Sequence, residues 1–185
     1  MITCLFGSSR YNGNSKIIVD YLLGETNHQI INLFDKNIEK VKDHRHLDDT
    51  SSDLHHDDYS SVLKSVIDAD TIVLSTPLYW YSMSASLKLF IDRWTESLRE
   101  EERSDFKDKM AKKRYIVVIV GGDNPTVKSK PLIAQFELIF EFMHITDYSF
   151  LVGEGVAPLD ILKDENIIKK AKALNIDLKY ESKNA

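Results

Sequence analysis

The chain has 185 residues, 43% of them hydrophobic, and no Pro-, Gly- or Ser-rich linker, so we expect one domain spanning residues 1–185 with a full core. Its 24 lysines and arginines against 29 aspartates and glutamates give a net charge of −5, which argues against general attraction to nucleic acid or an anionic membrane. The single cysteine excludes an intramolecular disulfide, and the longest apolar run, Tyr115 to Val120, is too short to span a bilayer, so we expect a cytoplasmic protein.

Short apolar runs alternate along the chain with amphipathic helical patterns. Most of these runs lack polar alternation, which is typical of strands buried on both faces. Strands alternating with helices predict an α/β fold with an open, doubly wound parallel sheet, and five strands suit the flavodoxin order 2-1-3-4-5. The strands are expected at residues 2–6, 29–33, 71–75, 115–120 and 148–152, and the helices around residues 17–22, 59–67, 87–98, 132–143 and 167–174.

The first expected strand runs directly into a loop rich in Gly, Ser and Asn, and a helix follows at once. Gly7 and Gly13 allow the backbone to turn tightly and approach a ligand, and Arg10 offers a charged fork. The helix would direct its N–H groups and positive dipole end at the same place, with Asn14 or Ser15 as its N-cap. The segment therefore predicts a phosphate site, with a plain strand-to-helix turn as the alternative.

Two further loops would meet the first at the carboxyl edge of the sheet, because the first, third and fourth strands would be neighbours. The loop after the third strand carries three consecutive aromatic residues, Tyr79, Trp80 and Tyr81. The loop after the fourth carries Gly121 and Gly122, which permit close backbone approach. An aromatic stack beside a phosphate cradle suits a flat ring with a phosphate tail, so FMN is the expected ligand. Core or interface packing is the alternative role for the aromatic residues.

Two sequence strings resemble those of a known superfamily. GSSRYNGNS after the first strand and TPLYWYSMSASLKLFIDRW after the third are similar to the NAD(P)H-dependent FMN reductase superfamily of flavodoxin-like oxidoreductases. The resemblance spans most of the chain and weakens after Val152. It implies that the first loop holds the FMN phosphate through Ser8, Arg10, Asn14 and Ser15, that Pro77, Leu78, Tyr79, Trp80, Tyr81, Ser82 and Met83 line the isoalloxazine ring, and that Gly121, Gly122 and Asp123 complete the site.

The same resemblance implies an activity. NADH or NADPH would pass a hydride to FMN, which would release the electrons to a quinone, a nitro or azo compound, or free flavin in ping-pong order. Because the flavin carries the chemistry, no catalytic side chain is expected. A homodimer, usual in the superfamily, would bury the broad apolar helix face that includes Trp94. The alternative class is a non-enzymatic electron carrier or flavin-binding regulatory module, whose acidic charge would suit basic partners.

Within the superfamily, the chain most resembles the branch whose members carry clustered cysteines between strands two and three and often bind an iron–sulfur cluster. Residues 37–58 of this chain contain no cysteine, so no cluster is expected. Histidines and aspartates stand there instead, and imidazole and carboxylate groups do bind several divalent ions. A solvated loop explains this polar stretch without a ligand, so no metal is predicted. The residues concerned are Asp43, His44, His46, His55, His56, Asp57 and Asp58.

Cys4 and Arg10 stand at the C-x5-R spacing of cysteine-dependent phosphatases, in which a thiolate at a phosphate cradle is the nucleophile. Leu5 and Phe6 extend the strand beyond Cys4. We therefore expect the thiol to lie inside the sheet as a buried, inert group, and phosphatase activity is a remote alternative.

Three smaller expectations concern the helices. Ser129 should cap the helix over residues 132–143, with Pro131 in its first turn. His144 lies among apolar residues and is expected in the core rather than as a catalytic base. Lys88 and Asp92 are four residues apart on one helix and should form a surface ion pair of small energetic value.

Overall fold

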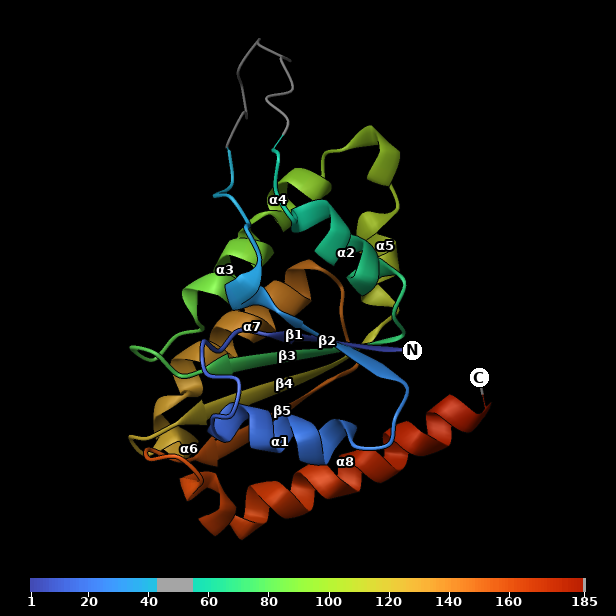
Figure 1. Cartoon of the computed structure of the whole chain (residues 1–185). Coiled ribbons are helices and arrows are strands. Elements are labelled where there is room, and N and C mark those ends of the chain that lie inside the picture. The colour runs from blue at the N-terminus through green and yellow to red at the C-terminus, as the bar shows by residue number, and fades with distance from the viewer. Residues whose placement is uncertain (43–54, 185) are drawn as a thin grey trace.

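The computed structural model describes residues 1–42 and 55–184. At its centre lies a five-stranded parallel sheet in the order β2-β1-β3-β4-β5 (Figure 1), which confirms the predicted fold class and strand order. The carboxyl ends of the strands lie together at the left of Figure 1. The strands are β1 (Ile2–Phe6), β2 (His28–Asn32), β3 (Thr71–Pro77), β4 (Arg114–Gly121) and β5 (Tyr148–Glu154).

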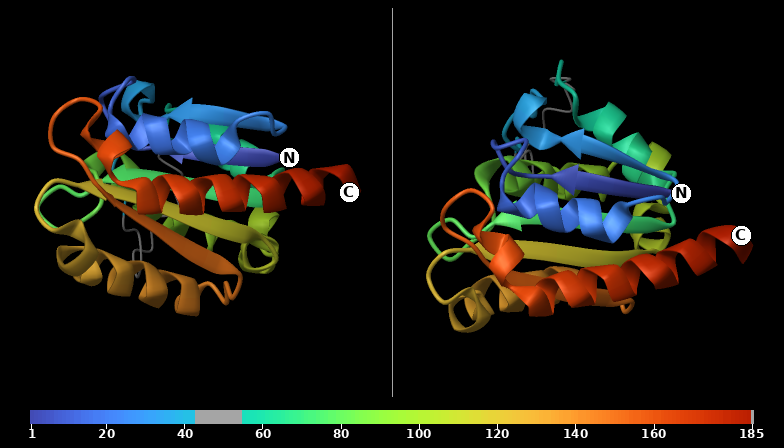
Figure 2. Two further views of the ribbon diagram at one scale, coloured as in Figure 1. Left: turned by 90° about the horizontal axis from the view of Figure 1, so that it is seen from below. Right: turned by 60° about the horizontal axis from the view of Figure 1, so that its bottom comes forward.

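Helices cover both faces of the sheet, and alternate strand residues contribute to two separate cores. Cys4 and Phe6 pack toward α1 (Asn14–Leu23) and α8 (Glu165–Asn184), which lie side by side below the sheet (Figure 2), whereas Leu5 packs into the opposite core. The opposite core includes side chains from α2 (Tyr59–Ile67), α3 (Ala85–Asp92), α4 (Trp94–Ser97), α5 (Phe106–Ala111) and α7 (Lys130–Phe142).

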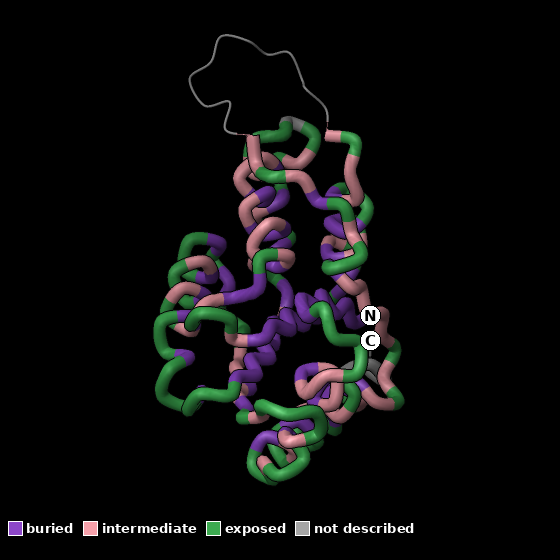
Figure 3. The backbone as a smooth tube through the Cα atoms, turned by 60° about the vertical axis from the view of Figure 1, so that its left-hand side comes forward, coloured by how far each residue is buried: buried purple, intermediate pink, exposed green. Residues whose placement is uncertain are grey.

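Burial differs between the centre and the edges of the sheet. Almost every residue of β1, β3 and β4 is buried, as their apolar runs predict (Figure 3). The prediction of burial on both faces is wrong for the edge strands, because every residue of β2 is only half-buried and β5 alternates between buried and more exposed positions. An edge strand has a neighbour on one side only, and its position in the sheet is decided by the whole fold.

The two predicted helix caps differ from the structure. The N-cap of α1 is Gly13, so neither Asn14 nor Ser15 has that role, and both lie in the first turn of the helix. The Asn14 side chain donates instead to the distant carbonyl of Ala157. Ser129 does occupy the N-cap position of α7, but its hydroxyl caps nothing, because α6 (Pro125–Lys128) brings the chain into α7 already in helical conformation. Pro131 lies in the first turn of α7, as expected.

Two of the predicted helices differ in extent from the structure. The stretch expected over residues 87–98 is divided at Arg93 into α3 and α4, and the last helix, α8, extends to 20 residues.

The core assignment of His144 is wrong, because this residue is exposed at φ 58° where the chain leaves α7, while Met143 and Ile145 on either side are buried. No helix in the described ranges has both the length and the apolarity needed to cross a bilayer.

Candidate functional site

A pocket of about 270 Å³ lies at the carboxyl edge of the sheet. It forms there because the parallel register brings the ends of β1, β3, β4 and β5 level, so the loops that follow them meet. Nine of the predicted site residues line it, together with four others. The lining residues are Ser8, Arg10, Gly13, Asn14, Ser15, Pro77, Leu78, Tyr79, Val120, Gly121, Gly122, Gly155 and Val156.

The loop after β1 supplies the polar end of the pocket. Ser8 and Ser15 are both buried, and the Ser8 hydroxyl accepts a bond from the backbone N–H of Arg10 at 3.2 Å. The N–H groups in the first turn of α1 face this end, where a helix has no intrahelical acceptor for them. Arg10 is the one charged side chain among the lining residues. The electrostatics of this end therefore favour an anion.

Gly7 holds this loop against the start of α3. Its N–H donates to the carbonyl oxygen of Ser75 at 2.8 Å. A Cβ atom at this position would lie 2.6 Å from Oγ of Ser84 and 3.1 Å from the Ser75 carbonyl oxygen. The close approach of the two segments thus requires glycine, whereas the sequence pattern indicated that Gly7 lets the backbone approach a ligand.

The loop after β5 closes over the first turn of α1, and sequence reasoning missed it. Nδ2 of Asn14 donates to the carbonyl oxygen of Ala157 at 2.9 Å, while Oδ1 of Asn14 is buried and has no partner in the structure. A Cβ atom on Gly155 would lie 2.7 Å from Nδ2 of Asn14. The sequence signal that could have indicated this loop is the pair of glycines, Gly153 and Gly155, at the end of the fifth strand.

The loops after β3 and β4 form the apolar side of the pocket. The N–H of Leu78 donates to the carbonyl oxygen of Val120 at 2.8 Å, which joins the loop after β3 to the end of β4. A Cβ atom on Gly121 would lie 3.1 Å from Cβ of Leu78, and one on Gly122 would lie 2.6 Å from Val156. The two glycines therefore leave room for neighbouring side chains and keep this wall of the pocket open.

A strained turn projects beside this wall. Tyr79 and Ser82 exchange two backbone hydrogen bonds of 3.1 and 3.0 Å, and the residues between them, Trp80 and Tyr81, have φ angles of 49° and 63°. Positive φ at both central residues is the pattern of a type I′ turn, in which Asn and Gly are strongly preferred. Bulky residues in this conformation cost of order 1–3 kcal/mol each. Trp80 is nevertheless 94% exposed.

The other five predicted site residues lie outside the pocket lining. Met83 is buried in the core, and the half-buried Ser82 donates to Gln135 at 3.4 Å. The Tyr81 hydroxyl donates to Oδ2 of Asp123 at 3.0 Å. Lys128 also binds that oxygen, and the bonds from Lys128 and Tyr81 lower the pKa of Asp123. Trp80, Tyr81 and Asp123 thus follow lining residues in the sequence without lining the pocket, and we call these three residues the rim. The bond from Tyr81 to Asp123 links the loops after β3 and β4.

Cys4 lies away from this pocket. Its thiol is fully buried in the core beneath α1 and α8, as expected from its place in the strand, and this burial raises the pKa of the thiol. A protonated thiol inside the sheet cannot attack a phosphate held near Arg10. The geometry gives the phosphatase alternative no support.

The histidine- and aspartate-rich segment is described only in part, since Asp43, His44 and His46 lie outside the described residues. His55 contacts Glu39 at 2.9 Å through Nδ1 and Glu96 at 3.1 Å through Nε2. Across residues 1–42 and 55–184, no three side chains of the metal-binding types are placed to hold an ion. The described end of the segment instead joins the chain before α2 to α4.

Asp57 belongs to the same ionic network. Its carboxylate pairs at 2.5 Å with Arg93, and both side chains are almost completely buried. Burial by itself disfavours the charged carboxylate, but bonds from the N–H of Glu39, from Arg93 and from the N–H of Tyr59 outweigh it and lower the pKa of Asp57. Arg93 also stacks over the Tyr59 ring at 4.4 Å from its centroid. This arrangement has a structural role.

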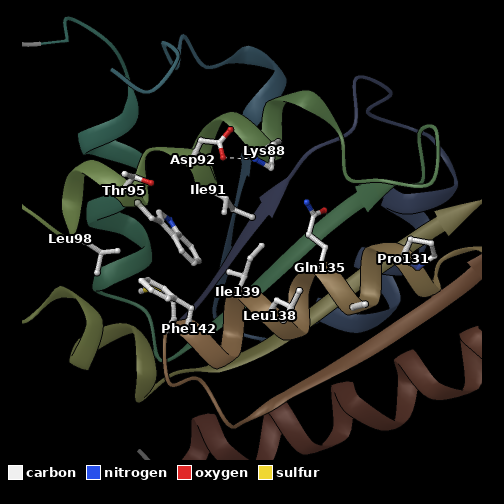
Figure 4. Close-up of a pocket in the computed structure, with 13 residues that line it drawn as sticks. Lys88, Ile91, Asp92, Thr95, Leu98, Pro131, Gln135, Leu138, Ile139 and Phe142 are labelled. Atoms are coloured by element: carbon white, nitrogen blue, oxygen red, sulfur yellow. Dashed lines mark hydrogen bonds and ion pairs between the residues drawn. The ribbon is translucent and has the colours of Figure 1, made fainter. Parts of the chain in front are cut away.

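A second concavity, the helix groove, lies between α3–α4 and α7 and has a volume of about 550 Å³. Figure 4 shows Ile91 and Ile139 pointing toward one another across it, and Lys88 and Asp92 form the expected ion pair at its rim. Leu138 is 67% exposed and Phe142 is 62% exposed, which is unusual for large apolar side chains gathered in one place. Nε1 of Trp94, which also lines the groove, is buried without a partner.

Comparisons with known proteins show which family has this architecture. A family model described as "Flavodoxin-like fold" matches residues 4–176. The chain belongs to that family. It is 37% identical over 173 residues, covering 94% of this chain and 95% of the relative, to YwqN of Bacillus subtilis (strain 168), to which the activity of an NAD(P)H-dependent FMN-containing oxidoreductase is provisionally assigned.

Two other relatives extend the comparison. An FMN-dependent NADH:quinone oxidoreductase of Stenotrophomonas maltophilia (strain K279a) is 29% identical over 106 residues, which cover 54% of this chain and 53% of that protein. The solved structure of the Trp repressor binding protein from Bacillus subtilis has 34% sequence identity and a TM-score of 0.78, covering 94% of this chain and 97% of that one. Two of these relatives carry FMN-dependent oxidoreductase names, which agrees with the resemblance in the loop sequences.

Proposed function

We propose that this protein is an FMN-dependent oxidoreductase that takes electrons from NADH or NADPH and passes them to a small aromatic acceptor. The observation that carries the proposal is the pocket at the carboxyl edge, where Arg10 is the one charged lining residue and an apolar wall stands opposite. Membership of the flavodoxin-like family and the names of the relatives support the same conclusion. FMN, when bound, would supply the chemistry of both transfers, accepting a hydride from the nicotinamide and releasing electrons to the acceptor, so no acid or base is required of the protein.

The polar end of the pocket fits the phosphate of FMN. Ser8, Arg10 and Ser15 would bind it together with the first N–H groups of α1, since all of these are donors. Asn14 offers two kinds of contact. Its Nδ2 donates one of its two N–H groups to Ala157 and keeps the other for the phosphate, whereas its unpartnered Oδ1 can only accept and suits a hydroxyl of the ribityl chain.

The apolar side of the pocket fits the isoalloxazine ring. Pro77, Leu78 and Tyr79 would line one side of the ring, and the backbone at Gly121 and Gly122 would approach its other edge. Both walls are held by main-chain hydrogen bonds to the end of β4, from Leu78 to Val120 and from Gly155 to Gly121, which fix their spacing. The nicotinamide and the acceptor would then use the same open face of the ring in turn, which is a ping-pong order.

A homodimer is the assembly that we propose, with the helix groove at its interface. Leu138 and Phe142 on α7 are the exposed apolar side chains that a second copy of the chain would cover. Trp94, expected on this uncovered face, is instead only 4% exposed and already packed in the core. The groove and the pocket have no lining residue in common. Dimerisation would therefore leave the lining of the pocket intact. A cytoplasmic location stays a prediction.

The first experiment is the visible absorption spectrum of the purified protein, followed by release of the chromophore and its identification by mass. Bound FMN, with steady oxidation of NADH or NADPH in the presence of a quinone, is the expected result. FMN without steady turnover would overturn the oxidoreductase assignment in favour of an electron carrier. Absence of FMN, with no fluorescence quenching on titration of FMN into the apoprotein, would overturn the cofactor assignment.

A further inference from the structure

The turn from Tyr79 to Ser82 combines two properties that stability alone does not explain. Its central residues, Trp80 and Tyr81, hold φ angles of 49° and 63°, which bulky L-residues rarely adopt. Trp80 is also 94% exposed, so the strained position is not compensated by packing of its indole. Strain that persists without local compensation is characteristic of positions that serve a ligand.

The turn is held rigidly in spite of this strain. Tyr79 and Ser82 exchange their two backbone bonds across it, and the Tyr81 hydroxyl is bonded to Asp123 of the neighbouring loop. Lys128 fixes that carboxylate at 2.6 Å. The chain after the turn is anchored by the bond of 2.9 Å from the N–H of Ser84 to Oγ1 of Thr76. The indole is therefore presented to solvent from a fixed support.

The position of the turn indicates what the indole would meet. Trp80 directly follows Tyr79, which lines the pocket, and lies on the loop that projects from the carboxyl end of β3 in Figure 1. Trp80 does not line the helix groove, so the surface that we assign to the dimer leaves it uncovered. A flat, electron-rich indole one residue beyond the pocket lining favours a flat, electron-poor ring by stacking and burial.

We propose that Trp80 is a specificity-determining residue that stacks against a planar aromatic electron acceptor, such as a naphthoquinone, as the acceptor docks at the open face of the pocket. This inference rests on the proposed function and names the substrate class of the same site. It gives Trp80 a role in acceptor binding in place of the contact with the flavin ring that the sequence implied. Selectivity for flat acceptors then comes from the rim, whereas the pocket lining holds the cofactor.

The test compares acceptors in the FMN-loaded enzyme. The ratio of kcat/KM for 1,4-naphthoquinone to kcat/KM for ferricyanide, which has no ring to stack, is measured with the same nicotinamide donor. Trp80→Ala should lower this ratio by about tenfold, and Trp80→Phe should restore most of it because phenylalanine keeps a π-face. Tyr180→Ala, which removes an exposed aromatic ring from the end of α8, is the matched control and should leave the ratio unchanged.

A second variant separates acceptor binding from a structural role. Asparagine tolerates positive φ, so Trp80→Asn should raise the melting temperature of the apoprotein by a few degrees while it lowers the acceptor ratio. An unchanged ratio in an FMN-loaded Trp80→Ala enzyme would overturn the inference, as would conversion of that variant from dimer to monomer, which would make Trp80 a subunit contact. Failure of the wild-type protein to bind FMN or to turn over would overturn the proposed function instead, and is seen before any variant is made.

Discussion

Two concavities of the molecule have opposite character. The pocket at the carboxyl edge of the sheet has a volume of about 270 Å³ and is built from four loops, with backbone donors and one arginine at one end. The helix groove is about twice as large, at about 550 Å³, and is lined mainly by apolar side chains of α3, α4 and α7. A choice by size and apolarity would select the groove as the ligand site.

The chemistry of the two linings favours the pocket as the ligand site instead. A phosphate needs convergent donors, which strand-to-helix loops and a helix N-terminus provide and which side chains on the faces of packed helices do not. The groove offers a broad apolar surface with exposed Leu138 and Phe142, which suits another protein surface. The difference teaches that donors held in place, and not volume, distinguish the pocket that we propose as the cofactor site from the groove. Each prediction below acts on one of the two regions and leaves the other as its internal control.

The largest expected effect concerns Arg93, which supports the helical wall of the groove from inside. Arg93→Met leaves the buried carboxylate of Asp57 without its partner, and removal of one member of a buried ion pair costs about 3–5 kcal/mol. Urea unfolding should show a loss of that size in the free energy of unfolding. The double variant with Asp57→Asn should recover part of the loss, and a loss below about 1 kcal/mol in the single variant would contradict a buried-pair role.

The same pair predicts a pH dependence. Because the folded-state pKa of Asp57 lies below its unfolded value of about 3.9, its contribution to stability is present above that value. The contribution is lost as the pH falls from about 4 through the folded pKa. Asp57→Asn should therefore flatten the acid limb of the curve of unfolding free energy against pH. An identical acid limb in the variant and the wild type would show that other carboxylates dominate acid unfolding.

Charges placed in the helix groove should separate assembly from cofactor binding. The paired substitution Leu138→Glu with Phe142→Glu should weaken the dimer by about a hundredfold or more, because it places charges where apolar surface would be buried. Light scattering after gel filtration measures the change in mass, and FMN affinity should stay within about twofold of the wild type. Ile176→Glu on α8 is the control for one exposed apolar residue outside the groove. A dimer that survives the paired substitution would remove the groove from the interface.

A smaller effect should follow from Arg10→Ala at the pocket. Loss of a charge-assisted bond to the phosphate is worth about 1.5–3 kcal/mol, so FMN affinity should fall by about ten- to a hundredfold in a fluorescence titration. The melting temperature of the apoprotein should hardly change, since Arg10 is exposed. Arg99→Ala removes the same charge from an exposed position outside the pocket and should keep wild-type affinity. Equal FMN affinity in Arg10→Ala would exclude Arg10 from the site.

The smallest effect is expected at the rim of the groove. Lys88 and Asp92 form an ion pair one helical turn apart with both side chains partly exposed in the single chain, and surface pairs at this spacing contribute about 0.3–0.5 kcal/mol. Lys88→Ala should therefore change the free energy of unfolding of the monomer by no more than that, measured at concentrations where the dimer has dissociated. A change above about 1 kcal/mol would show that the pair is not a simple surface contact.

The periodicity of the sequence determined the layered architecture. Apolar runs without alternation and helical spacing between them are enough to predict a parallel sheet, its strand order, and the meeting of the loops after β1, β3 and β4. Gly7, Gly121 and Gly122 could be singled out from sequence as points of close backbone approach, but the pattern indicated approach to a ligand, whereas the structure sets them against neighbouring segments of the chain. The burial of each strand and the apolar face of each helix are properties of one segment, so a local pattern records them. The order of the strands then follows because few topologies are open to alternating strands and helices.

Tertiary structure alone decided the features that join distant segments. The loop after β5 enters the pocket through the bond from Asn14 to Ala157, which lie 143 residues apart, and no local pattern records such a contact. The lower burial of β2 and β5, the Asp57–Arg93 pair and the bond from Tyr81 to Asp123 arise in the same way. A side chain's partner is fixed only when packing brings the two segments together, and its local sequence offers several partners of equal chemistry.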